Sequence, residues 1–151
     1  MPLVFRAMQS DGKAPIVGHS RNDTLGVRET TLGPNGKEIQ GDVKQVSGIV
    51  HPGMGGMSVS PAVEELPPHL IPKRFLAKYP AARRGNSLPD TFPWQLGDGT
   101  FAAGSLAEKL QLRIDPDDAG HGFVEPDAPM SLQELRTAVE ATCPKWSCSN
   151  W

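Results

Sequence analysis

The sequence predicts a small α+β domain made of short strands, few helices and many ordered loops. Glycine and proline are abundant, with 16 and 15 residues in a chain of 151. This excess disfavours a helical bundle, because both residue types interrupt helices and favour turns. Apolar residues also occur in short runs that alternate with polar ones, which is the period of a strand with one buried face. A single segment near the C-terminus has helical spacing together with its own cap. These observations favour short sheets joined by loops that border a cleft.

Composition limits the function classes that the sequence allows. The length predicts one domain over residues 1–151, and 38 % apolar with 21 % charged residues predicts a globular chain. A net charge of −2 gives no general attraction to nucleic acids or anionic membranes. No apolar run approaches the roughly 18 residues of a membrane span, and the N-terminal residues lack the apolar core of a secretory signal. We therefore expect a cytosolic protein, with any export following a route without a cleaved signal.

The two cysteines, Cys143 and Cys148, are too few and too close together for a disulfide scaffold. Their spacing also lacks the further ligands of a metal site. We expect free thiols and no bound metal.

The first strand is expected over residues 3–8, where Arg6 lies among apolar neighbours. An arginine in this position needs a partner or the mouth of a pocket, because an unpaired buried charge is costly. The alternative is an edge-strand arginine that reaches solvent. Further along, Gly33-Pro-Asn-Gly36 predicts a turn.

The glycine-rich stretch 51–61 leads into a short strand, Met57-Ser-Val-Ser60. Alternation of apolar and hydroxyl residues places Ser58 and Ser60 on one face. Glycines allow close approach of another molecule to the backbone, so this face is a candidate wall of a polar cleft. The alternative is an ordinary turn and strand whose serines face water.

The middle of the chain is less regular. Residues 62–66 predict one helical turn that ends at Pro67-Pro68, and residues 69–72 an extended segment, since a residue before proline avoids the α region. Residues 73–84 are ambiguous. Residues 85–93 predict a loop, followed by a turn at 94–99 in which Trp94 is either a core residue or a stacking platform. Basic residues gather in this part, forming either a solvated face or a phosphate- or target-binding patch: Lys73, Arg74, Lys78, Arg83 and Arg84.

The last third of the chain has the clearest pattern. Ser105 and Glu108 have capping-box spacing, which predicts a short helix over 106–110, whereas residues 110–114 alternate as a strand. Residues 120–126 predict an extended segment that carries His121 and Glu125. A second capping box, Ser131 to Glu134, opens the most regular predicted helix, with one apolar face formed by Leu132, Leu135 and Val139 and with Ala138 as a candidate fourth member.

Four motifs in this order resemble the small type VI secretion effector toxins of the ADP-ribosyltransferase fold, and their uncharacterised relatives in bacteria and fungi. The motifs are Phe5-Arg-Ala, Gly55-Gly-Met-Ser-Val-Ser, Leu66-Pro-Pro-His-Leu-Ile-Pro, and His121-Gly-Phe-Val-Glu-Pro with Pro129-Met130. The resemblance implies a compact split β-sandwich with a cleft and a few peripheral helices. It also implies a cytotoxic effector that acts on a cytosolic target, uses NAD as cosubstrate, and is neutralised by a cognate immunity protein.

Carried over to this sequence, the resemblance gives Arg6 the phosphate or ribose contact and makes Ser58 and Ser60 the cofactor wall, together with Gly56 and Met57. Glu125 would then be the acid that stabilises positive charge on the sugar.

Active transferases of this class usually carry an acid or glutamine two residues before the glutamate, whereas this chain has Phe123 there. His121 is therefore an alternative catalytic group, although a histidine between glycines is also typical of a structural hydrogen-bonding role. Two further functions are compatible with the same scaffold. One is related chemistry, such as phosphoryl transfer on RNA or another NAD-consuming reaction; the other is a non-enzymatic binding protein.

Overall fold

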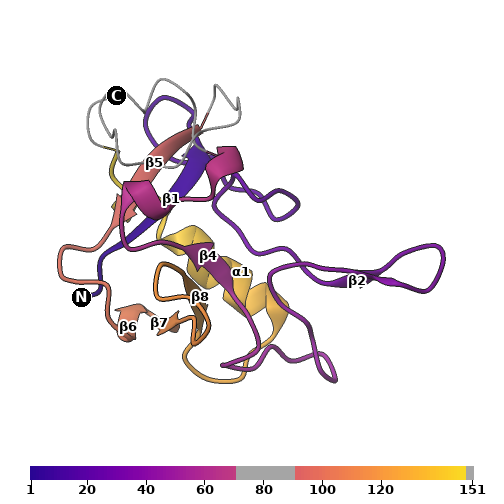
Figure 1. Cartoon of the computed structure of the whole chain (residues 1–151). Helices are drawn as coiled ribbons and strands as arrows, with labels where there is room; N and C mark the ends of the chain where they lie inside the picture. The colour runs from indigo at the N-terminus through magenta and orange to yellow at the C-terminus, as the bar shows by residue number, and fades with distance from the viewer. Residues whose placement is uncertain (71–90, 149–151) are drawn as a thin grey trace.

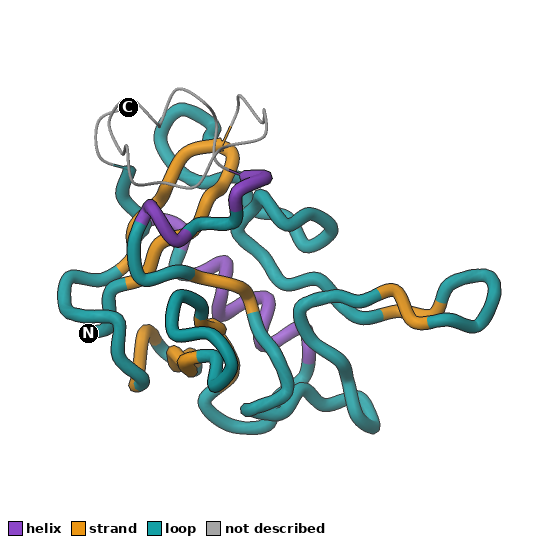
Figure 2. Tube along the Cα trace, in the orientation of Figure 1, coloured by secondary structure: helices purple, strands orange, loops and turns teal. Residues whose placement is uncertain are grey.

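In a computed structural model, which describes residues 1–70 and 91–148, the chain has a mixed α+β fold (Figure 1). Strand β1 (Val4–Gln9) pairs antiparallel with β5 (Thr91–Leu96). A four-stranded antiparallel sheet has the order β4-β8-β7-β6, formed by Met57–Val59, Gly122–Pro126, Leu110–Ile114 and Gly104–Ala107. Loops connect these short strands over much of the chain (Figure 2). The α+β class predicted from the sequence is confirmed.

A small hairpin of β2 (Thr31–Leu32) and β3 (Glu38–Ile39) extends away from the rest of the fold (Figure 1). Its connection is the predicted turn, in which the Gly36 N–H donates to the Gly33 carbonyl at 3.0 Å. Gly36 has a φ of 76°, a conformation that favours glycine.

The two main sheets meet where β1 passes the end of β4. Phe5 and Ser60 exchange both backbone hydrogen bonds, each 2.8 Å long. This bridge sets Arg6, the next residue of β1, close to the strand that carries Ser58. It is the main reason why two segments far apart in the sequence form one site.

The core lies between the sheets and the helix α1 (Leu132–Ala141). Trp94 is 4 % exposed, and its indole N–H donates to the Met8 carbonyl, so it is a core residue rather than a stacking platform. The buried face of α1 consists of the three predicted apolar residues, Leu132, Leu135 and Val139. The predicted N-cap also forms, since Ser131 Oγ accepts from the Glu134 N–H at 3.1 Å. A separate small apolar cluster is formed by Ala7, Val63, Leu66 and Leu70.

Short 3₁₀ turns flank these elements. The predicted helical turn is present as η1 (Val63–Glu65), and η4 (Cys143–Lys145) follows α1. Cys143 and Cys148 are not joined by a disulfide bond. Within the described residues, no helix is long and apolar enough to cross a membrane.

The predicted loop and turn over residues 91–96 are wrong, because this segment is β5. Its six residues pair with β1, and Pro93 lies opposite Ala7. Proline removes a donor, which an edge strand tolerates. Hydrogen bonding to the distant strand β1 therefore overrides the local sequence signals for a turn.

The helix predicted over residues 106–110 is also wrong. This part of the chain forms β6, a tight turn and β7, with Lys109 in the left-handed region at a φ of 67°. The strand predicted over 110–114 is confirmed, and it pairs on both sides. Sheet pairing thus overrides a local capping signal.

The extended segment predicted at 69–72 begins instead as η2 (Pro68–Leu70), closed by the Leu70 N–H donating to the Pro67 carbonyl at 2.9 Å. A proline disfavours the α conformation only in the residue directly before it, which for Pro72 is Ile71, so it does not prevent a 3₁₀ turn at Pro68–Leu70. Ile71, Pro72, the ambiguous basic segment 73–84 and the loop 85–90 lie outside the described residues.

Candidate functional site

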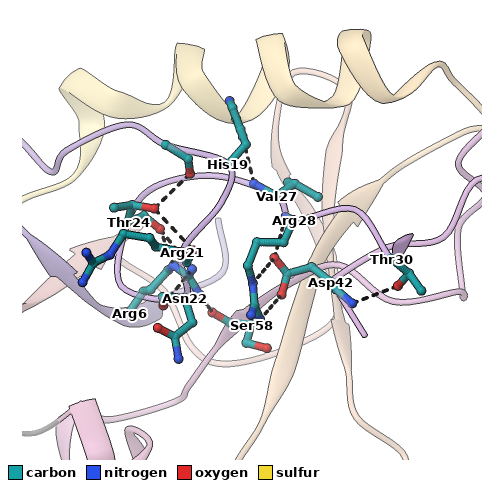
Figure 3. A network of polar contacts seen from close by, with 12 residues as sticks. Arg6, His19, Arg21, Asn22, Thr24, Val27, Arg28, Thr30, Asp42 and Ser58 are labelled. Atoms are coloured by element: carbon teal, nitrogen blue, oxygen red, sulfur yellow. Dashed lines mark hydrogen bonds and ion pairs between the residues drawn. The ribbon is translucent and has the colours of Figure 1, made fainter. Parts of the chain in front are cut away.

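A cavity of about 170 Å³ opens where β1, β4, the 22–28 loop and η2 meet. Three residues that the sequence predicted to share a cleft, Arg6, Ser58 and Ser60, all line it. His121 lines it as well. The remaining polar lining groups are Asn22, Arg28, Asp42 and His69. The predicted cleft is therefore present, and Figure 3 shows much of its polar network.

Arg6 lies at the buried end of this network and does not reach solvent, since it is only 5 % exposed. Its Nε and Nη2 both donate to the Thr24 carbonyl, at 3.1 and 3.0 Å. Nη2 also donates to the Asn22 carbonyl at 3.1 Å, and Nη1 to the Ser58 carbonyl at 2.7 Å. Four of the five N–H groups of the guanidinium are thereby directed at backbone oxygens. Arg6 thus joins β1, β4 and the 22–24 loop.

Burial lowers the pKa of Arg6 from its ordinary value to about 10, and the nearby carboxylate of Asp42 partly opposes this shift. Desolvation disfavours the charged form of any buried base. Because the pKa stays far above neutral pH, the guanidinium keeps its charge and all its donors.

The alternation predicted for β4 is confirmed. Met57 and Val59 are each 1 % exposed and belong to the core, whereas Ser58 on the other face is partly exposed and lines the cavity. Ser60 is 3 % exposed, and its hydroxyl donates to the Glu65 carbonyl at 3.2 Å. Ser58 is therefore the serine whose hydroxyl is best placed to meet a ligand. Met57 does not line the cavity.

Gly56 borders a second cavity, of about 420 Å³, on the side of the β2–β3 hairpin. A side chain at this position would bring its Cβ within 2.5 Å of the Val124 carbonyl oxygen. Glycine is thus required for the close pairing of this segment with β8, and it leaves the cavity wall without a side chain. Gly56 contributes backbone to the site.

Arg28 and Asp42 form an ion pair between the two cavities and line both (Figure 3). Arg28 Nη2 lies 3.0 Å from Asp42 Oδ1, and Nε lies 3.3 Å from Oδ2. The Arg28 backbone N–H donates to the same carboxylate at 2.7 Å, which fixes Asp42 in place. The Asp42 side chain is 5 % exposed and that of Arg28 is 34 % exposed. Arg28 is therefore the more accessible partner.

His121 contributes an imidazole from the turn before β8. Its Nδ1 lies 2.9 Å from Asp115 Oδ2, and the His121 hydrogen bond is the main cause that lowers the pKa of Asp115. With the Asp115 carboxylate accepting from Nδ1–H, the neutral tautomer of His121 has its acceptor lone pair on Nε2. The ring of Phe123 meets His121 edge-on, with centroids 4.7 Å apart. These two contacts fix the orientation of the His121 ring, which lines the cavity.

Glu125 is placed differently from the other predicted residues. It is fully buried and does not line either cavity. Its carboxylate accepts from the Gly53 N–H at 2.5 Å, from Arg113 Nε at 3.1 Å and from Gln111 Nε2 at 3.3 Å. These contacts hold the glycine turn that precedes β4. In this geometry, Glu125 positions the backbone rather than facing a ligand.

Sequence reasoning missed Asn22, Arg28, Asp42 and Asp115. Asn22 and the Arg28–Asp42 pair lie in irregular segments, where neither periodicity nor a motif singles out a polar residue. No sequence pattern indicated Asp115 either, because its role depends on a hydrogen bond to His121 that forms only when the intervening turn is folded. Only the folded backbone brings Asn22, Arg28 and Asp42 to the cavity and sets Asp115 beside His121.

Comparison with models of known protein families gave no match, and comparison with curated proteins gave none either.

Proposed function

We propose that the protein is a small cytotoxic effector with an ADP-ribosyltransferase-like fold and activity, using NAD as cosubstrate in the cytosol of a target cell. The observation that carries this proposal is the meeting of Arg6, Ser58 and Ser60 in one cavity. The resemblance assigned cofactor contacts to these residues from short motifs more than fifty positions apart, and their geometry supports a common site.

The donor set of the cavity fits a ligand with ribose and phosphate groups. Ser58 offers a hydroxyl, Arg28 a partly exposed guanidinium, and His121 an oriented imidazole. Arginine suits phosphate because its planar N–H groups can donate to two oxygens at once.

The proposed reaction needs a bond to break at the ribose and a proton to be removed from the acceptor. In ADP-ribosyl transfer the nicotinamide leaves with the electron pair of the glycosidic bond, and the acceptor forms a new bond to the same carbon. His121 Nε2 would take the proton of the acceptor, with Asp115 stabilising the imidazolium that forms. The carboxylate in the cavity wall is Asp42, which is the nearest counterpart to the role that the resemblance gave to Glu125.

The proposal is tested by incubating purified protein with NAD and measuring release of nicotinamide, alongside growth of bacteria after induced expression. Ser58→Ala and His121→Ala should abolish both effects. Ser105→Ala and His51→Ala are matched controls, because Ser105 is exposed on β6 and His51 lines neither cavity. A cognate immunity protein, encoded beside the toxin, should restore growth. If the wild type neither consumes NAD nor inhibits growth, the proposal fails, and a non-enzymatic binding role on the same scaffold is favoured.

A second candidate, phosphoryl transfer on RNA, is favoured by one observation. Two histidines, His69 and His121, line the same cavity as Arg28, and paired imidazoles can act as acid and base while a cation stabilises the phosphate. Cleavage of bacterial RNA without NAD, lost in both His69→Ala and His121→Ala, would select this reaction over ADP-ribosyl transfer.

A further inference from the structure

The two cavities share part of their lining, so they are direct neighbours, and we refer to them together as the groove. Arg28, Asp42 and Ser58 border both the cavity of about 170 Å³ and that of about 420 Å³. In Figure 3 the Arg28–Asp42 pair and Ser58 lie together at this junction. A ligand that occupied both cavities would therefore pass these three residues.

Arg28 has donors available for such a ligand, whereas Arg6 does not. Arg6 directs four N–H groups at carbonyl oxygens and is 5 % exposed. The Arg28 side chain is 34 % exposed, and its hydrogen bonds to other described residues use only Nε and Nη2. Nη1 of Arg28 donates to none of the described residues. The accessible arginine of the groove is thus Arg28.

The sizes of the cavities indicate how a ligand would be divided between them. Pockets that enclose a whole small ligand usually measure about 300–1,000 Å³. The first cavity is below this range, so it suits one half of a dinucleotide, while the larger cavity offers room for the other half. Backbone of Gly55 and Gly56 lines the larger cavity, which allows close approach of a ligand.

We infer that the groove binds a ligand whose two halves are joined by a diphosphate, one half in each cavity, and that Arg28 binds the diphosphate at the junction. This inference rests on the proposed use of NAD. The resemblance gave the phosphate contact to Arg6, whereas this inference gives it to Arg28, which lies outside all four motifs. Asp42 holds the Arg28 guanidinium in position, and the phosphate oxygens engage its remaining N–H groups.

The test is calorimetric binding of NAD and ADP-ribose, which share the diphosphate, to wild type and Arg28→Gln. Because Arg28→Gln loses the charged hydrogen bonds to the diphosphate, its affinity for both ligands should fall by roughly 10- to 100-fold. The salt dependence of binding should also flatten, since a phosphate–guanidinium attraction is screened by salt. Arg21→Gln is the matched control, because Arg21 forms a similar pair with Asp23 but lines neither cavity. Its affinity should equal that of the wild type.

A second variant keeps the test decisive if Arg28→Gln does not fold. Met54 is 47 % exposed and lines only the larger cavity. Met54→Glu adds an anion there without disturbing the core. Because this carboxylate would repel the diphosphate, the affinity for NAD and ADP-ribose should fall at least about tenfold.

The outcomes separate this inference from the proposed function. Wild-type affinity for NAD and ADP-ribose in folded Arg28→Gln, or in Met54→Glu, overturns the inference and leaves the proposed use of NAD standing. If the wild type binds neither ligand, both the inference and the proposed use of NAD are overturned.

Discussion

Replacing Arg6 by alanine should lower the stability of the fold, and any loss of activity should follow from this loss of stability. The substitution removes four hydrogen bonds and leaves the carbonyls of Asn22, Thr24 and Ser58 without these donors. Hydrogen bonds to charged groups contribute about 1.5–3 kcal/mol each, and breaking a buried charged network by removing one partner typically costs about 3–5 kcal/mol. We expect a loss near that range, because relief of the desolvated charge offsets part of the lost hydrogen bonding.

This expectation differs from the one that the sequence supports. A phosphate-binding arginine at the mouth of a pocket would be replaceable with little loss of stability. In the structure, Arg6 instead joins two strands and a loop, so the loop that carries Asn22 and Thr24 would lose its attachment. A loss of about 3–5 kcal/mol corresponds to a fall in melting temperature of roughly 6–20 °C for a chain of this size.

The assay is urea and thermal unfolding followed by the fluorescence of the buried tryptophans Trp94 and Trp146. Arg6→Lys should lose less than Arg6→Ala, since one ammonium keeps the charge but cannot reach all three carbonyls. Arg21→Ala is the control: its side chain is 60 % exposed, and its partner Asp23 keeps the hydrogen bond from Gln9 Nε2 at 2.9 Å, so the loss of stability should be smaller. An Arg6→Ala variant within about 1 kcal/mol of the wild type would refute the reasoning.

Four further outcomes are expected. Ser58→Ala should abolish activity while the free energy of unfolding, measured in urea, changes by no more than about 0.5–1 kcal/mol, since Ser58 is partly exposed and lines the cavity rather than the core. Glu125→Gln should lower stability by about 3 kcal/mol, because it removes a fully buried charge with three donors; an unchanged melting temperature with lost turnover would instead indicate a catalytic glutamate. Asp115→Asn should reduce turnover and change the pH–rate profile, because the ionised Asp115 carboxylate accepts from His121 Nδ1–H and orients the imidazole in the wild type. The stability that Asp115 contributes is present above the ordinary aspartate pKa of 3.8 and is lost as the pH falls through its lower folded-state pKa. Replacing Cys143 and Cys148 by serine should leave activity unchanged, and Cys143 should react slowly with iodoacetamide at pH 8, because burial raises its pKa.

Much of the fold follows from local patterns in the sequence. The strand at residues 3–8, the alternation of Met57 to Ser60 and the capped helix after Ser131 were all predictable, because each depends on residues within one turn or one strand. The shared cavity of Arg6 and Ser58 was predictable too, since each offers a polar group from an otherwise apolar strand.

Tertiary structure decided the rest, for physical reasons that no local window contains. Residues 91–96 became a strand because β1 supplied the missing hydrogen bonds, although their own sequence favours a loop and a turn. The sequence alone determined that Arg6 needs a partner and that Glu125 is a candidate acid. Only the folded chain determined that Arg6 finds its partners in backbone carbonyls, and that Arg113 and Gly53 enclose Glu125. Arg28 and Asp42 entered the site in the same way, since their separate irregular segments meet only when the chain is folded.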